Sequence, residues 1–149
     1  MALSQEEIVS ERFIHRDLLR QAEAAVRAIY GIWRRERKVT PTLFTWPAER
    51  IRTERGEPHE GICLLELPEG SEKRSEAILA MVRRTKAYGL LLIEQKPDEV
   101  CAIFETRHGA RCWQIPLVTH GDVVLLGRAE VREDALHVGL LWSPTVGQG

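Results

Sequence analysis

The sequence predicts an α+β fold in which a long N-terminal helix and one further helix pack on a mostly antiparallel β-sheet. Apolar residues first recur every three or four positions as far as about Arg37, which is the spacing of one helix face. After Gly89 they gather instead in short runs of strand length. Polar segments of a few residues separate these runs, and such short connections favour antiparallel neighbours. The chain therefore ends in a predicted four- to five-strand meander.

Length and composition predict one domain. The chain has 149 residues, of which 44% are hydrophobic, and this is enough to bury a core. We assign residues 1–144 to the domain and 145–149 to a flexible tail. Lys+Arg and Asp+Glu number 21 and 22, so no overall field favours nucleic acid, and such a partner would need a local patch.

The N-terminus and the cysteines indicate a cytoplasmic protein. The opening residues lack the apolar region of a signal peptide, and no apolar run approaches the roughly 18 residues of a membrane span. Cys63, Cys101 and Cys112 form an odd number without a C-x-x-C pair. We expect buried thiols in a reducing compartment and no membrane partner.

The N-terminal half reads as helix, strand, long connection and strand. Ser4 and Glu7 have the form of a capping box and predict the helix start. Thr40-Pro41 ends the helix, because the residue before proline avoids the helical region. Residues 43–46 then form a short extended piece, and the polar residues 48–60 form an exposed connection.

The apolar run 61–67 (GICLLEL) predicts a strand covered on both faces, and therefore a central strand. Ser71 is the expected N-cap of the second helix, and Gly89 its left-handed stop. The strand-like runs that follow are 90–95, 100–106, 110–117, 123–128 and 136–142.

Glu94-Gln95-Lys96 follows an apolar strand and resembles the second half of the PD-(D/E)XK nuclease motif. In that family carboxylates bind a divalent metal and the lysine stabilises charge around the attacked phosphate. Glu66 is the candidate for the acid of the preceding strand, although a whole helix intervenes. A catalytic set of Glu66, Glu94 and Lys96 is thus an alternative to a simple hairpin end with solvated side chains.

Four side chains are candidate zinc ligands by residue type: His59, His108, His120 and Cys112. Their spacing matches no compact ligand pair except His108 with Cys112, which flank a predicted turn. The chain also lacks a nucleophile elbow, a phosphate loop and a dinucleotide fingerprint. We therefore expect no metal and no cofactor.

Basic residues cluster at three places. The runs 34–38 and 83–86 lie in the last turns of predicted helices, where cations interact favourably with the helix dipole. Arg50, Arg52 and Arg55 in the polar connection have no such explanation. They leave a nucleic-acid-binding accessory protein as a further alternative.

Residues 87–144 carry a run of strand and turn patterns: AYGLLLIEQ, KPDEVCAIFET, RHGARCWQIPL, a D-x-V-x-L-G step from Asp122 to Gly127, and GLLWSP. This run resembles small uncharacterised proteins encoded in bacteriophage, mobile-element and related bacterial genomes, which have a helical front half and a similar meander. The resemblance implies a phage-linked or accessory protein. It implies no activity and no functional residue.

The function that the sequence favours is a non-enzymatic protein-interaction or structural subunit. Its apolar pattern is complete, whereas polar groups do not assemble into a recognisable site. We expect a protein partner or self-association, through an exposed sheet edge or through a long helix only half covered by its own sheet.

Overall fold

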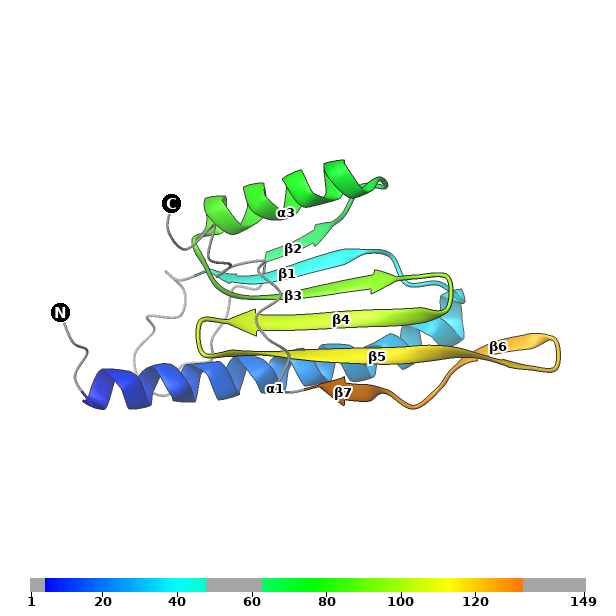
Figure 1. The fold of residues 1–149 in the computed structure, drawn as a ribbon, viewed down its shortest axis with the longest axis horizontal. Coiled ribbons are helices and arrows are strands. Elements are labelled where there is room, and N and C mark those ends of the chain that lie inside the picture. Colours follow the sequence, from blue (N-terminus) through cyan, green and yellow to red (C-terminus); the bar gives the residue numbers. More distant parts are fainter. Residues whose placement is uncertain (1–4, 48–62, 133–149) are drawn as a thin grey trace.

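We describe the fold of residues 5–47 and 63–132 from a computed structural model. It confirms the α+β fold: one antiparallel sheet carries a long helix on one face and a shorter helix on the other (Figure 1). The order of helices and strands also follows the prediction. The elements are α1 (Gln5–Glu36), β1 (Thr42–Pro47), β2 (Cys63–Glu66), α3 (Ser71–Thr85), β3 (Ala87–Gln95), β4 (Glu99–Thr106), β5 (Gly109–His120), β6 (Val123–Leu126) and β7 (Glu130–Arg132).

Helix α1 is the predicted long amphipathic helix, and it crosses under the sheet in Figure 1. It ends at Glu36, and Arg37 follows in the left-handed region at φ 58°. Ser4 lies outside the described residues, so the capping box stays a prediction. The face that α1 turns to the sheet is apolar and buried, and comprises Leu18, Ala22, Val26, Ile29 and Trp33.

The strand order is β2-β1-β3-β4-β5-β6, with β7 pairing beside β6 on the long strand β5. The prediction that 61–67 forms the central strand is wrong, because β2 lies at the edge and pairs only with β1 among the described strands. The physical reason is the path of the chain. Strand β1 lies between β2 and β3, which run parallel to each other, and α3 carries the chain across from β2 to β3.

The boundaries of α3 also differ from the prediction. Its N-cap is Gly70 at φ 97°, without a side-chain cap hydrogen bond, so Ser71 is the first helical residue instead of the cap. The left-handed residue after the helix is Lys86 at φ 48°, whose N–H bonds the carbonyl of Arg83. The helix therefore stops at Thr85, four residues before Gly89, which lies inside β3.

The core consists of two apolar layers separated by the sheet. Leu91 and Ile93 face α1, where they join Phe104 and Trp113, whereas Leu90 and Leu92 face α3. Because β3 is covered on both sides, its apolar run is continuous rather than alternating. The layer under α3 comprises Leu43, Leu67, Ile78, Met81, Leu90 and Leu92.

The C-terminal half forms the predicted meander from β3 to β6, with antiparallel pairing throughout. Residues 130–132 add the short strand β7, which the sequence did not predict. The predicted strand 136–142 and the tail 145–149 lie outside the described residues. No helix in the described ranges is long and apolar enough to cross a membrane.

Gly89 is required by close packing, not by a turn. A Cβ there would stand 3.0 Å from Thr106 Cγ2 and 3.3 Å from the Glu105 carbonyl oxygen. We expect Gly89→Ala to lower the free energy of unfolding by about 1–3 kcal/mol, the usual cost of overpacking. Urea denaturation followed by circular dichroism measures this change.

Gly31 provides the matched control, because it lies in α1 and its added Cβ would meet only the flexible Arg35 side chain at 3.7 Å. Gly31→Ala should raise the free energy of unfolding by about 0.5–1 kcal/mol through helix propensity. If both variants shift stability in the same direction, the packing explanation for Gly89 is wrong.

Candidate functional site

The two carboxylates of the nuclease interpretation do not converge. Glu66 on β2 pairs with Thr42, which pairs with Ile93, so these three side chains share the face of the sheet that carries α1. Glu94 follows Ile93 and therefore points to the opposite face. Strand β1 separates β2 from β3, which adds about 9–10 Å between their backbones. One metal ion cannot bridge carboxylates in this arrangement.

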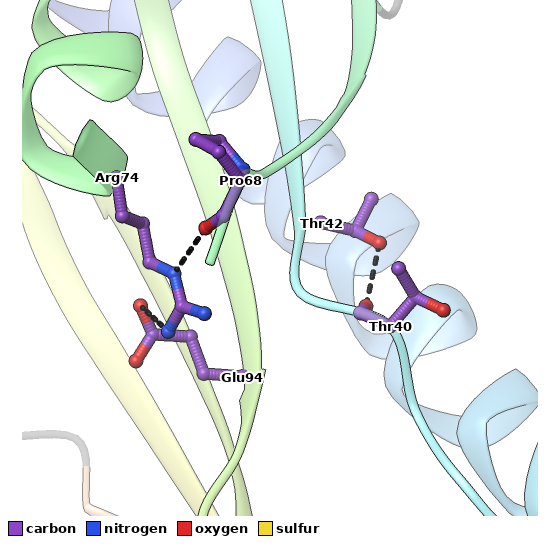
Figure 2. Close-up of polar contacts among 5 residues, drawn as sticks. All are labelled: Thr40, Thr42, Pro68, Arg74 and Glu94. Atoms are coloured by element: carbon purple, nitrogen blue, oxygen red, sulfur yellow. Dashed lines mark hydrogen bonds and ion pairs between the residues drawn. The ribbon is translucent and has the colours of Figure 1, made fainter. Parts of the chain in front are cut away.

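Both Glu94 and Lys96 take part in ordinary structural contacts. Figure 2 shows Arg74 of α3 reaching the carbonyl of Pro68 with Nε, at 3.3 Å, and Glu94 with Nη1, at 3.7 Å. This ion pair ties the start of α3 to β3. Lys96 is exposed, and its backbone N–H donates to the Glu99 carbonyl across the turn.

His108, Cys112 and His120, the candidate zinc ligands that the structure describes, form no metal site either. The described residues contain no group of three His, Cys, Asp or Glu side chains that could hold a metal ion. His120 is exposed at the end of β5. His59 and the three arginines of the polar connection, Arg50, Arg52 and Arg55, lie outside the residues that the structure describes.

A polar junction that the sequence did not reveal joins α1 to the β4–β5 turn. The Nδ1 of His15 hydrogen-bonds the hydroxyl of Thr106, which also accepts the backbone N–H of His108 at 3.1 Å. The His15 ring stands edge-on to His108, with the centroids 6.4 Å apart, and it lies against Gly109. Arg111 and Glu23 add an ion pair nearby between β5 and α1. The junction fixes where α1 crosses the sheet.

A half-open groove of about 390 Å³ lies between the C-terminal half of α1 and strands β1 and β3. Its lining residues are Ala25, Ala28, Ile29, Ile32, Glu36, Val39, Thr40, Thr42, Phe44 and Ile93. The volume lies within the range of small-molecule sites, but such sites also bring several polar groups to one point. Here Thr42 turns its hydroxyl to the carbonyl of Thr40, as Figure 2 shows.

The most exposed apolar surface is the hairpin formed by the end of β5 and β6. Val118, Val123 and Leu125 are 46%, 43% and 42% exposed. The register pairs Val118 with Leu125 and His120 with Val123, so these side chains share one face of the hairpin. We call Val118, Val123 and Leu125 the hairpin patch. The sequence contains no signal for this exposure, because the run VVLL is apolar without alternation, which is typical of a strand buried on both faces.

Helix α1 holds this hairpin from its other side. The Trp33 indole N–H donates to the carbonyl of Val124 at 2.9 Å, and Arg37 donates to the same oxygen at 3.3 Å. The Tyr30 hydroxyl donates to the carbonyl of Gly127 at 2.8 Å. The edge of β6 is thus partly engaged by α1, whereas the hairpin patch is left open to solvent.

Cys101 and Cys112 are free thiols with little reactivity. Burial, with a further contribution from the hydrogen bond to Glu99, raises the pKa of Cys101 to about 11. Burial also raises the pKa of Cys112. Both thiols therefore stay protonated at neutral pH, as expected from the sequence, and neither has the lowered pKa of a nucleophile.

The pKa of Cys101 predicts its alkylation. At pH 8 the thiolate fraction should be about 100-fold lower than for a thiol at the ordinary value of 9.0. In the native protein, the rate of reaction of Cys101 with iodoacetamide should keep rising between pH 9 and pH 11. In the protein unfolded by urea, the rate should level off above pH 9, the ordinary pKa of a thiol. Peptide mass mapping follows this cysteine separately from the other two.

The same shift sets the direction of a stability change. The native state holds the Cys101 proton more tightly than the unfolded state, so the free energy of unfolding should fall as pH rises from about 9 to about 11. The fall should be smaller in Cys101→Ser. An identical pH dependence of the free energy of unfolding in the wild type and in Cys101→Ser would contradict the raised pKa of Cys101.

Comparison with known proteins adds no assignment: neither the family models, nor the curated proteins, nor the solved structures contain a match to this chain.

Proposed function

We propose that this protein is a non-enzymatic interaction subunit that docks through the hairpin patch, and that it acts as an accessory protein. The observation that carries the proposal is the exposure of three large aliphatic side chains on one face of a hairpin that α1 holds in place. Exposed apolar residues gathered on one surface are typical of protein contact sites.

The anchoring of the hairpin supports a docking role. A loosely held hairpin would gain free energy by folding its aliphatic side chains onto the core. Here the bonds from Trp33 and Tyr30 to the backbone of the hairpin oppose such a rearrangement. A surface that is already ordered loses less conformational entropy when it binds.

We propose a second copy of the chain as the partner. The hairpin patch carries no charge, so two copies can meet face to face without placing like charges together. Twofold association of one surface with itself is also the commonest arrangement in soluble oligomers. The contact would use the face of the hairpin, because the Val124 carbonyl on the β6 edge already accepts bonds from α1.

Two equally exposed valines make a matched test. Val118 lies in the hairpin patch and Val131 lies on β7, and each is 46% exposed. Val118→Asp should raise the dimer dissociation constant at least about tenfold, because a contact apolar group is lost and a charge must be desolvated. Val131→Asp should leave it unchanged.

Light scattering over a concentration series measures the average mass of the particles in solution. A single chain has a mass of 17.0 kDa, so a dimer has twice this mass. A wild-type protein that stays monomeric at every concentration argues against the second copy. Equal weakening by both aspartates would mean that the hairpin patch is not the contact.

A further inference from the structure

A second surface of the molecule carries a different chemistry. Four exposed arginines lie along the outward face of α1: Arg16, Arg20, Arg27 and Arg34. At 100° per residue they fall within an arc of about 40°, and at 1.5 Å per residue they span about 27 Å of the helix axis. We call these four residues the arginine row.

The arginine row has no carboxylate partners among the described residues, since no ion pair of the structure involves its members. The nearest acids on α1 are already engaged: Glu23 pairs with Arg111, and Asp17 accepts a hydrogen bond from Gln21 at 3.3 Å. The row therefore presents four guanidinium groups to solvent.

The helix dipole does not explain the arginine row. The helix dipole favours cations only in the last turn, which includes Arg34 but not the other three. Arg16 and Arg20 stand four residues apart, where like charges oppose helix formation, whereas Glu23 stands three residues after Arg20 and four before Arg27, where opposite charges favour it. The helix dipole therefore accounts for one member of the row and leaves the other three without that explanation.

The charge of the chain is also unevenly distributed. Residues 13–38 contain seven Arg or Lys and three Asp or Glu, a formal net charge of +4, whereas the whole chain carries −1. The rest of the chain is accordingly acidic, with a formal charge of −5. The overall balance conceals a local basic surface, and such surfaces attract polyanions over a Debye length.

From this geometry we propose that the arginine row binds the phosphate backbone of double-stranded nucleic acid without reading its sequence. The guanidinium fork matches phosphate oxygens in two-point hydrogen bonds. A straight row on one helix suits a rigid duplex with regularly repeating charge. Glu23 lies beside the row between Arg20 and Arg27, but its carboxylate is paired with Arg111. To one side of the row lie the small exposed residues Ala24 and Ala28, which allow close approach and offer no group to read base edges.

Other anionic partners fit the arginine row less well. A helix that lies on a membrane places several large apolar residues beside its cations, whereas from residue 13 onward this face carries Phe13 as its only exposed large apolar side chain. Single strands are bound by stacking on several aromatic side chains, which the face also lacks. The inference is independent of the hairpin patch, which uses other residues.

The test is the salt dependence of binding to a fluorescent DNA duplex of about 20 base pairs and mixed sequence, measured by anisotropy. Four phosphate contacts predict a slope of log K against log salt of about −3.6, so affinity should fall about 150-fold between about 50 and 200 mM salt. In Arg20→Gln/Arg27→Gln the slope should be about −1.8, and the same change in salt should cost about 12-fold.

The matched control is Arg83→Gln/Arg84→Gln, which removes the same charge from exposed residues in the last turn of α3. This variant should bind like the wild type, and a duplex of unrelated sequence should bind both equally. Circular dichroism and thermal melting establish that each variant folds. An RNA duplex of matched length distinguishes the two kinds of backbone.

The proposal is overturned if the wild type does not bind either duplex, or if both double variants weaken binding equally. Tighter binding to anionic vesicles or to polyglutamate than to duplexes would assign the row to another partner and would also overturn it. Repeating the salt titration with Val118→Asp distinguishes failure of this proposal from failure of the proposed dimer. Loss of the hairpin contact should leave the slope of log K against log salt, counted per chain, unchanged.

Discussion

The structure depends on the burial of β3 from both sides. Leu91 and Ile93 pack under α1, and Leu90 and Leu92 pack under α3, so one strand joins two apolar layers that would otherwise be separate. Neither helix can leave without exposing one side of this strand. At one end of the sheet, Gly89 of β3 packs closely against Thr106 of β4, and Thr106 is hydrogen-bonded to His15 of α1. These contacts also hold β3 and α1 in place relative to each other.

Much of the fold could be predicted because helix and strand leave different periods in the sequence. The long helix, the second helix and the meander all follow from residue spacing. The place of each strand in the sheet could not be predicted in the same way. The run 61–67 is apolar enough for a central strand, but strand order depends on α3 crossing past β1, and that path leaves no local signal.

The candidate sites depend on contacts between residues far apart in the chain, so the sequence predicted them less well. Glu66 and Glu94 both lie on strands, and only the register places them on opposite faces. The arginine row was visible in principle, because its members share one side of a helical wheel. The contiguous basic runs include Arg34 but not Arg16, Arg20 or Arg27, which are scattered along the sequence.

Strand β5 links the buried core to the hairpin patch through one uninterrupted backbone. Trp113 and Ile115 point into the core, and the same alternation turns Val118 outward. Insertion of a single residue between Ile115 and Leu117 would exchange the two faces of the hairpin, turning Val118 toward the core and Leu117, which packs against the core, away from it. The spacing along this strand therefore determines both which side chains enter the core and which side chains form the exposed hairpin patch.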